Sequence, residues 1–356
     1  MGKDDASLEK SREIRTQVIE KYGFVPTSLL FIKKDVDASS FKQEDYEVSQ
    51  KLRIKYGCVP ISLLHINYNW GNHVLEFEER KQHKRAQEKH KKMKYNIKSY
   101  TTQAGEQKSF NEGLEQFNMS SQNVRGKGGG LSTMPPMLVN FVVNFYSEPN
   151  DIVLDVCAGH NSRMQIVYEN QHDYIGYDVS ETFMEFNEKI KAQLLGESGQ
   201  NLIFKPKNTI TLRLQSSEHL LETDDSIGLV FTSPPYFRQE DYGDEPEQLG
   251  KSKTYGEFLL RIKQIIKECL RVLKPGKFCV FNVDDFRNGG VFFPFHADIM
   301  RIYQEVGFKL FDVGIVPWRG CIRACFASEI EKDKILGKAH EYIIVGQKPN
   351  LEPKGE

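Results

Sequence analysis

The sequence lacks a long apolar run and an excess of one charge. The first absence argues against a membrane protein, and the second leaves the kind of partner open. No stretch of its 356 residues is apolar enough to span a bilayer, and the polar first ten residues, MGKDDASLEK, are unlike a signal peptide. The net charge is −1, from 48 basic and 49 acidic residues, so overall charge does not by itself indicate a nucleic-acid partner. These features predict a cytoplasmic protein without a membrane segment.

Cysteine is also scarce, and its pattern favours neither a disulfide framework nor a metal centre. The six cysteines lie mostly inside apolar segments and form no CxxC pair. We therefore expect reduced thiols in a protein core. Cys321 and Cys325 are close in sequence, but no matching Cys or His pair accompanies them, so we expect no metal site.

Apolar residues make up 39% of the chain, with 23 Phe and 15 Tyr, which is enough for a sizeable core. From about Leu131 onward, short apolar runs alternate with amphipathic helical stretches. The runs are DIVLDVCAG, DYIGYDVS, IGLVFTSPPY, GKFCVFNV, FKLFDVGIV and EYIIVGQK. Such runs predict a mostly parallel sheet covered on both faces. We expect a doubly wound, Rossmann-like α/β domain over residues 131–350, with ligands at the carboxyl ends of its strands.

The first third of the chain, residues 1–130, has a different pattern and contains an internal repeat. KYGFVPTSLL begins at Lys21 and KYGCVPISLL begins at Lys55, 34 residues later. Each copy follows a charged helical stretch, and its Gly and Pro are typical of a helix end. A duplicated helix–turn packing unit and a specific DNA-contact element are both open interpretations.

A strongly basic stretch, ERKQHKRAQEKHKKMK, follows at Glu79–Lys94. It is rich in helix formers and favours either a solvated helix face or a helix that contacts phosphates. Residues 99–130 are polar and end in GKGGG, which predicts a mobile connection. We therefore expect residues 1–130 to form a mainly helical accessory region that contacts DNA.

The segment Thr232–Tyr236, TSPPY, directly follows an apolar run and so lies at the carboxyl end of a predicted strand. Pro234 and Pro235 remove backbone donors and fix φ, which holds the neighbouring carbonyls in a set direction. These carbonyls and the Ser233 hydroxyl can accept hydrogen bonds from an NH2 group, and the Tyr236 ring offers a face for stacking a base. The alternative is an ordinary Pro-rich turn.

An exocyclic amine of cytosine or adenine is a poor nucleophile because its lone pair is delocalised into the ring. Acceptors that hold both N–H bonds favour a pyramidal nitrogen, so catalysis would consist of positioning and electrostatics. The base must leave the duplex, because its amine is paired there. Ser233, Pro234, Pro235 and Tyr236 are therefore the predicted catalytic residues.

TSPPY resembles the catalytic motif of DNA amino-methyltransferases, in which a short polar residue precedes two prolines and an aromatic residue. The resemblance covers about residues 131–348. It implies transfer of a methyl group from S-adenosylmethionine to an exocyclic amino nitrogen of a flipped base in double-stranded DNA, as in restriction–modification. Serine at the first motif position is associated more with cytosine N4 than with adenine N6. The YGxVPxSLL element also resembles the lead-in of some phage DNA methylases, which implies a phage or prophage origin.

Further segments are predicted to hold the cofactor. In DIVLDVCAG, Asp155 ends a strand, and the small residues Ala158 and Gly159 let a ligand approach the backbone. Asp178 ends the next strand, 19 residues after Gly159, a spacing that suits hydrogen bonds to ribose hydroxyls; a structural acid that caps the next helix at Ser180 is the alternative. Without a GxGxxG motif, S-adenosylmethionine is favoured over NAD. The segment around Thr133 and Pro135 resembles the family segment that closes over the cofactor. The predicted cofactor-binding residues are therefore Thr133, Pro135, Asp155, Ala158, Gly159 and Asp178.

The resemblance has departures and extensions. His160–Ser162 replace the family's usual Gly-rich continuation, and Gln215 and Ser216 stand where relatives often carry Asp. Asp241–Thr254 and His340–Tyr342 resemble family segments that close over the base or shape its pocket. Asn282–Asp285 ends the fifth predicted strand and is expected to face the site as well.

Two other functions remain as alternatives: an RNA amino-methyltransferase, because phosphate attraction is not sequence-specific, and a catalytically silent DNA-binding protein. Methylation at cytosine carbon-5 is disfavoured because it needs a nucleophilic Cys, typically after Pro, and the chain has no Pro-Cys pair. We expect the N-terminal third and residues 288–334 to read bases.

Overall fold

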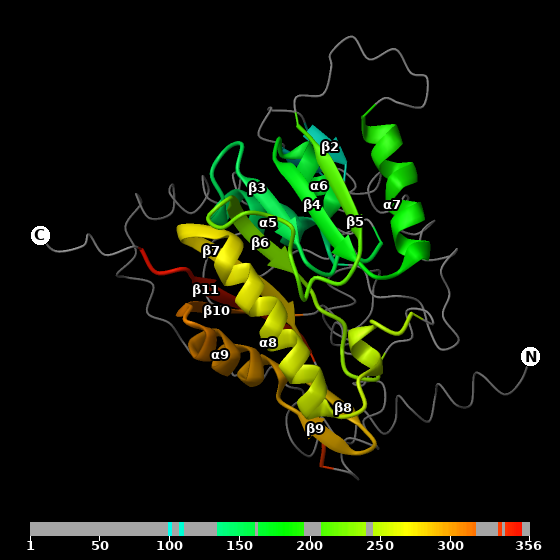
Figure 1. Cartoon of the computed structure of the whole chain (residues 1–356), viewed down its shortest axis with the longest axis vertical. Helices are drawn as coiled ribbons and strands as arrows, with labels where there is room; N and C mark the ends of the chain where they lie inside the picture. Colours follow the sequence, from blue (N-terminus) through cyan, green and yellow to red (C-terminus); the bar gives the residue numbers. More distant parts are fainter. Residues whose placement is uncertain are drawn as a thin grey trace, which may run out of the picture.

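A computed structural model describes the predicted catalytic region and a small part of the N-terminal third (Figure 1). The described residues are 99–101, 107–109, 134–160, 163–195, 208–239, 245–317, 334–336 and 339–350. The internal repeat, the basic stretch Glu79–Lys94 and Thr133 lie outside them. Within the predicted connection, β1 (Ser99–Thr101) and β2 (Gln107–Ser109) pair in antiparallel fashion.

Seven strands form one sheet in the order β10-β11-β7-β6-β3-β4-β5. Their bounds are β3 Ile152–Asp155, β4 Asp173–Asp178, β5 Ile210–Leu214, β6 Ile227–Thr232, β7 Leu273–Val283, β10 Lys309–Pro317 and β11 His340–Gln347. Strands β3 to β7 are parallel, and β11 runs antiparallel to both β7 and β10. The predicted mostly parallel, Rossmann-like α/β sheet is confirmed.

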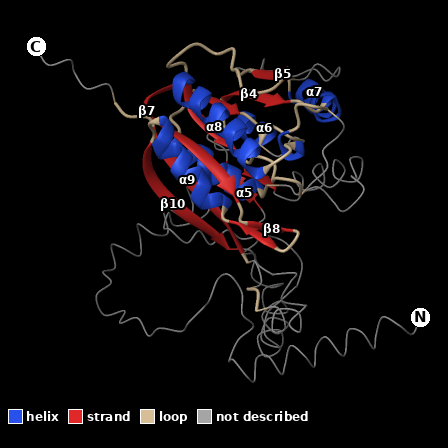
Figure 2. Cartoon of the chain, turned by 60° about the horizontal axis from the view of Figure 1, so that its bottom comes forward, coloured by secondary structure: helices blue, strands red, loops and turns tan. Residues whose placement is uncertain are grey.

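Helices cover both faces of this sheet (Figures 1 and 2). They are α5 Pro136–Tyr146, α6 Met164–Glu169, α7 Glu181–Leu194, α8 Tyr255–Val272 and α9 Phe295–Val306. One core cluster joins α5 and α6 to Leu229 and Phe231 of β6. The other cluster joins α8 and α9 to Val230, the β6 residue between Leu229 and Phe231. Neighbouring β6 residues thus serve opposite faces, which is why the strand is apolar throughout.

Helix α8 lies where the sequence EFLLRIKQIIKECLRVL predicts a helix. The Thr254 hydroxyl caps it by accepting a hydrogen bond from the Glu257 amide at 3.1 Å. Phe258, Ile262 and Ile265 are buried at helical spacing, so one face of the helix packs on the sheet. Among the helices that the structure describes, we find none with the length and apolarity of a bilayer-spanning segment.

Two features differ from the sequence-based expectations. Pro275 and Gly276, residue types that favour a turn, lie inside β7, where Gly276 has a φ of +76°. A hairpin of β8 (Phe286–Asn288) and β9 (Val291–Phe293), which the sequence analysis did not predict, follows the sheet strand β7. Gly289 and Gly290 both have positive φ, as a two-residue hairpin turn requires.

Candidate active site

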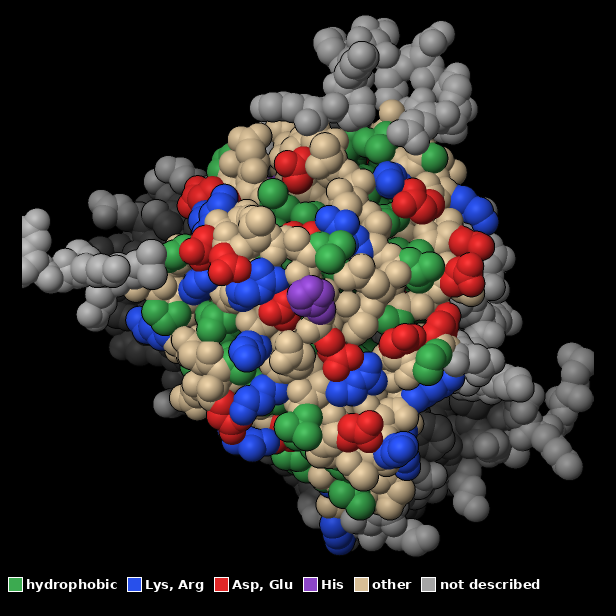
Figure 3. All heavy atoms as spheres, viewed as in Figure 1, with side chains coloured by type: hydrophobic (Ala, Val, Ile, Leu, Met, Phe, Trp, Pro, Cys, Tyr) green, Lys and Arg blue, Asp and Glu red, His purple; other side chains and the backbone are tan. Residues whose placement is uncertain are grey.

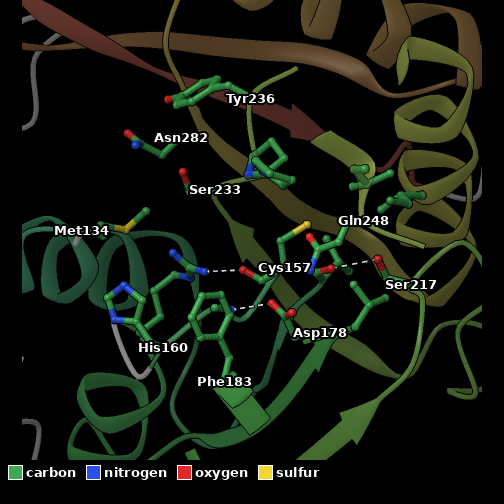
Figure 4. A pocket seen from close by; sticks show the side chains of 18 of the residues that line it. Met134, Cys157, His160, Asp178, Phe183, Ser217, Ser233, Tyr236, Gln248 and Asn282 are labelled. Carbon is green, nitrogen blue, oxygen red and sulfur yellow. Dashed lines mark hydrogen bonds between the residues drawn. The ribbon is translucent and has the colours of Figure 1, made fainter. Parts of the chain in front are cut away.

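A cleft with about 1040 Å³ of empty space, part of it open to solvent, lies at the carboxyl ends of the central parallel strands. Strand β6 contributes the segment after its last residue, the loop after β3 contributes Cys157, and β4 contributes Asp178. Figure 4 shows these side chains around the cleft, with Tyr236, Asn282 and Ser233 together on one side.

Most of the predicted site residues meet in this cleft. Those that line it are Pro135, Gly159, Asp178, Ser233, Pro234, Pro235 and Tyr236. Asp155 and Ala158 lie behind the wall, since neither is among its lining residues in the described part of the chain. Thr133 is outside the described residues, so its role stays a prediction. The sheet thereby brings segments that are more than 50 residues apart in sequence to one place.

The predicted catalytic segment is held from both sides. Thr232 ends β6 and is fully buried; its hydroxyl donates to Asp155 Oδ1 at 2.8 Å and accepts from the Cys157 amide at 3.2 Å. The Tyr236 ring is half-buried, with ring centroids 5.6 Å from Phe286 and 6.1 Å from Phe295. Phe286 of the β8–β9 hairpin and Phe295 of α9 therefore support the tyrosine at the cleft.

Asp155 braces the loop that follows β3. Its carboxylate is fully buried and accepts hydrogen bonds from Arg163 Nε at 2.5 Å and from the Tyr174 hydroxyl at 3.0 Å. The Arg163 guanidinium is also buried and donates to the carbonyls of Cys157 and Ala158 at 2.6 and 3.3 Å. Burial lowers the pKa of Arg163, but the nearby Asp155 charge raises it, and the net shift is upward. Asp155 thus fixes the shape of the loop from beneath.

Asp178 makes the contact with the next helix that the sequence offered as its structural alternative, and its ribose role stays a prediction. It lines the cleft, and its Oδ1 accepts from the Ser180 amide at 2.9 Å at the start of α7. Its Oδ2 accepts from the Gly159 amide at 2.8 Å. Burial raises the pKa of Asp178 to about 6, although the two backbone hydrogen bonds oppose the shift. The carboxylate is therefore poised to change charge in mildly acidic solution.

One residue that the sequence analysis missed, Asn187, shapes the same loop. The buried Asn187 of α7 donates from Nδ2 to the Gly159 carbonyl at 2.7 Å. Gly159 has a φ of +56°, and an added Cβ would meet nothing within 4 Å, so the left-handed backbone is the constraint there. Asn187 shares the buried face of α7 with Phe183 and Ile190, and a polar residue on such a face was the available signal.

His160, where the family's loop usually has glycine, lines the cleft and is 5% exposed. Its ring lies 5.6 Å from the Phe183 ring, and its Nδ1 has no hydrogen-bond partner within the described ranges. Burial, and then the Arg163 charge, lowers the pKa of His160 to about 4, so the ring is neutral at pH 7. It therefore adds a polar but uncharged group to the wall.

The opposite side of the cleft is formed by the segment after β5 and by residues 245–254. Gln215 and Ser216 line it, and the Ser217 hydroxyl donates to the Val156 carbonyl at 2.8 Å. Of the predicted closing loop Asp241–Thr254, residues 245–254 are described, and Gln248 lies on the side of Ser217, away from Tyr236 (Figure 4).

Asn282 and Glu341 close the cleft beside the catalytic segment. Asn282 of β7 is 4% exposed and donates from Nδ2 to Glu341 Oε2 of β11 at 2.7 Å. Both residues line the cleft. They belong to two segments that were expected to face the site, Asn282–Asp285 and His340–Tyr342. The predicted segment His340–Tyr342 is itself the start of β11 rather than a loop before it. Asp285 instead accepts from His296 Nδ1 at 2.6 Å.

The fold and the cleft define an α/β protein with an open cleft at the carboxyl edge of its parallel strands. A family model described as DNA methylase, N6_N4_Mtase, matches residues 14–189 and 227–352. Because the match covers well over half of the sequence, the chain belongs to this DNA methylase family. The matched range includes both copies of the internal repeat and the TSPPY segment.

Curated relatives match shorter segments. The chain is 35% identical over 108 residues to Type II methyltransferase M.MjaVI of Methanocaldococcus jannaschii, covering 30% of this chain and 53% of that protein. It is 33% identical over 137 residues to Type II methyltransferase M.XycI of Xanthomonas campestris pv. cyanopsidis, covering 36% of this chain and 42% of that protein. The chain thus spans about half or less of these relatives. A crystal structure of a SAM-dependent methyltransferase from Methanosarcina mazei aligns with a TM-score of 0.40 at 14% identity, covering 62% of this chain and 100% of that one.

Proposed function

We propose that this protein is a DNA methyltransferase that transfers a methyl group from S-adenosylmethionine to an exocyclic amino nitrogen of a base extruded from double-stranded DNA. The observation that carries the proposal is that Ser233 and Tyr236 line the same cleft as Asp178 and Gly159. A base-positioning segment and a cofactor-type loop are therefore within one ligand's reach of each other. The relatives named Type II methyltransferases support the same reaction.

At the base end, this chain's task is to orient the amine. The Ser233 hydroxyl and the carbonyls of the diproline segment accept its N–H hydrogen bonds, and Tyr236 stacks on the base. Holding both N–H bonds turns the nitrogen lone pair out of conjugation with the ring. The barrier falls by positioning and preorganised polarity, with no covalent intermediate on the protein.

At the cofactor end, the residues fit S-adenosylmethionine. Asp178 presents a carboxylate suited to ribose hydroxyls, and Gly159 keeps the loop free of a side chain at the cleft wall. Phe183 adds an apolar ring, and His160 adds a buried nitrogen without a partner in the described residues. When bound, S-adenosylmethionine supplies an electrophilic methyl group, and the base nitrogen that receives it gives up one proton to solvent.

Ser233 at the first motif position supports cytosine N4 over adenine N6 as the acceptor, by resemblance to the family pattern. The catalytic and cofactor roles of the named residues, the division at residues 130 and 131, and the phage or prophage origin belong to the same proposal. So does a restriction–modification setting.

The base-reading role proposed for residues 288–334 has support at its first residues. At the tip of the β8–β9 hairpin, Val291 and Phe292 are 56% and 48% exposed. The exposed Arg287 guanidinium lies 5.0 Å from the centre of the Phe292 ring. Basic and apolar groups at a hairpin tip suit contact with phosphates and unstacked bases. Basic and acidic side chains are interspersed over the face shown in Figure 3, so a localised contact is favoured over a broad basic surface.

The test uses the purified full chain, isotopically labelled S-adenosylmethionine and duplex DNA. Digesting the DNA to nucleosides and identifying the methylated one by mass spectrometry should give N4-methyldeoxycytidine. N6-methyldeoxyadenosine would move the proposal to the other amino base. Label found only in an RNA substrate would favour an RNA methyltransferase, and no label in either nucleic acid would overturn methyl transfer to nucleic acid.

A further inference from the structure

Asn282 holds a buried hydrogen-bond acceptor that the described protein leaves unused. The residue is next to last in β7, is 4% exposed and lines the cleft. Figure 4 shows its side chain on the same side of the cleft as Ser233 and Tyr236. Its Oδ1 atom is fully buried and has no hydrogen-bond partner among the residues that the structure describes. A buried acceptor left in this state destabilises the protein unless a ligand supplies the donor.

Glu341 sets the orientation of this amide. The distance from Asn282 Nδ2 to Glu341 Oε2 is 2.7 Å. An ionised carboxylate only accepts hydrogen bonds, so the NH2 end of the amide must face Glu341. The Oδ1 end is then fixed on the other side. The pair thus presents an oriented acceptor rather than an amide free to flip.

The strand order places this acceptor on the base side of the catalytic segment. In the sheet, β7 and β11 lie on one side of β6, whereas β3 and β4, which lead to Gly159 and end in Asp178, lie on the other. Asn282 therefore faces Ser233 from the side opposite to the cofactor-type residues. This position favours the base, rather than the ribose or adenine of a cofactor, as the source of the donor that reaches Asn282 Oδ1.

We propose that Asn282 Oδ1 accepts a hydrogen bond from the amino group of the target base and that Glu341 is the positioning residue for this contact. The inference rests on the proposed function and names a further acceptor for its substrate. Asn282 would then share the two N–H bonds of the amine with the acceptors of the catalytic segment, the Ser233 hydroxyl and the diproline carbonyls.

This arrangement also selects the class of base. Cytosine N4 and adenine N6 are donors, whereas the corresponding thymine O4 is an acceptor. An oxygen of thymine or uracil placed here would face Asn282 Oδ1 acceptor to acceptor, without a proton between them. The pair therefore favours bases with an amino group over those with a carbonyl at that position.

The inference is tested with Asn282→Ala in the full chain, with Asn208→Ala as the matched control. Asn208 precedes β5, and its Nδ2 donates to the Gln171 carbonyl, remote from the cleft. With S-adenosylmethionine saturating, Asn282→Ala should lower kcat on duplex DNA by about 10- to 100-fold, as expected for a lost transition-state hydrogen bond in a buried site. The dissociation constant of S-adenosylmethionine, measured by calorimetry, should change by less than about twofold. The control should match the wild type in both.

The outcomes separate the sources of the donor. A large loss of S-adenosylmethionine affinity with kcat preserved would assign the acceptor to the cofactor's ammonium group and overturn the inference. Wild-type kcat and affinity in Asn282→Ala would overturn it as well. Failure of the wild-type chain to methylate DNA would instead overturn the proposed function.

Glu341 gives the second measurement. Glu341→Ala frees the Asn282 amide to flip, so it should lower kcat without changing the S-adenosylmethionine dissociation constant. Glu341→Gln keeps an acceptor for Asn282 Nδ2 and should restore part of kcat. Equal kcat values for these two variants, with melting temperatures like that of the wild type, would contradict the positioning role.

Discussion

Thr232 and Asp155, 77 residues apart in sequence, share a 2.8 Å hydrogen bond between Thr232 Oγ1 and Asp155 Oδ1. The bond joins the last residue of β6 to the last residue of β3 at the edge where the cleft opens. The catalytic segment and the loop after β3 are therefore not independent, since displacement of one moves the support of the other.

The first prediction concerns the catalytic segment. Ser233→Ala should reduce methyl transfer to duplex DNA by about 10²- to 10³-fold, because one preorganised polar contact to the amine is lost. Tyr236→Ala should reduce it by about 5- to 150-fold through lost stacking. Single-turnover assays measure both losses. Ser226→Ala, at the amino end of β6, is the control, since the Ser226 hydroxyl only donates to the Thr223 carbonyl at 2.7 Å. Full activity of Tyr236→Ala would rule out stacking.

A second prediction is the pH dependence of cofactor binding. The folded-state pKa of Asp178 is about 6 and the ordinary value is 3.8. The carboxylate protonates as pH falls through about 6, so S-adenosylmethionine affinity should fall with it if ribose hydroxyls donate to Asp178. Asp178→Asn should weaken binding by about 10- to 100-fold at pH 8 and flatten this pH dependence. Calorimetry from pH 5 to about pH 8 decides it; an unchanged affinity in the variant would reject the ribose contact.

The same shift has a consequence for folding stability, with the opposite sign from the usual carboxylate. Because the Asp178 pKa is higher in the folded state than in the unfolded state, the folded protein binds more protons between pH 3.8 and about 6. The contribution of Asp178 to the free energy of unfolding therefore falls as pH rises through this window. Asp178→Asn should remove that slope in urea unfolding measured across it.

A third prediction concerns the buried ion pair beneath the loop. Arg163→Leu leaves the Asp155 carboxylate buried without its cation and should lower the free energy of unfolding by about 3–5 kcal/mol. Arg301→Ala is the matched control. Arg301 is 58% exposed and pairs with Asp298 at 3.0 Å, so its loss should cost about 1 kcal/mol or less. Urea denaturation measures the free energy of unfolding of both variants. Similar losses would show that the buried ion pair stabilises the fold no more than the exposed one.

The fourth prediction concerns the hairpin tip. Phe292→Ser should raise KM for duplex DNA severalfold while the S-adenosylmethionine dissociation constant stays at the wild-type value, since Phe292 is not among the described residues that line the cleft. Leu260→Ser, on an exposed position of α8 that is 69% exposed, controls for the loss of a surface apolar group. Equal KM values for Phe292→Ser and the wild type would exclude a DNA contact there.

The sequence alone predicts the parts of the site that depend on local order. TSPPY and Asp178 each follow an apolar run, so their positions at strand ends come from patterns of fewer than ten residues. The parallel sheet follows in the same way from the succession of such runs. The predicted ligand edge and the cleft coincide for this reason.

The contacts that the sequence alone did not reveal join residues that are distant in sequence. Asn187 meets Gly159 across 28 residues, and Asn282 meets Glu341 across 59. No periodicity within one segment encodes such pairs, because they depend on which strands become neighbours. Arg163 is only 8 residues from Asp155, yet its burial could not be predicted, because it depends on the conformation of the loop between them.

The reversed direction of β11 has a consequence for how the protein is made. Because β11 runs against β7, its first residues, among them Glu341, reach the edge where the parallel strands end. One wall of the cleft is therefore completed by a residue that follows Asn282 by 59 positions. During synthesis, Asn282 gains this hydrogen-bond partner only after that further length of chain has left the ribosome.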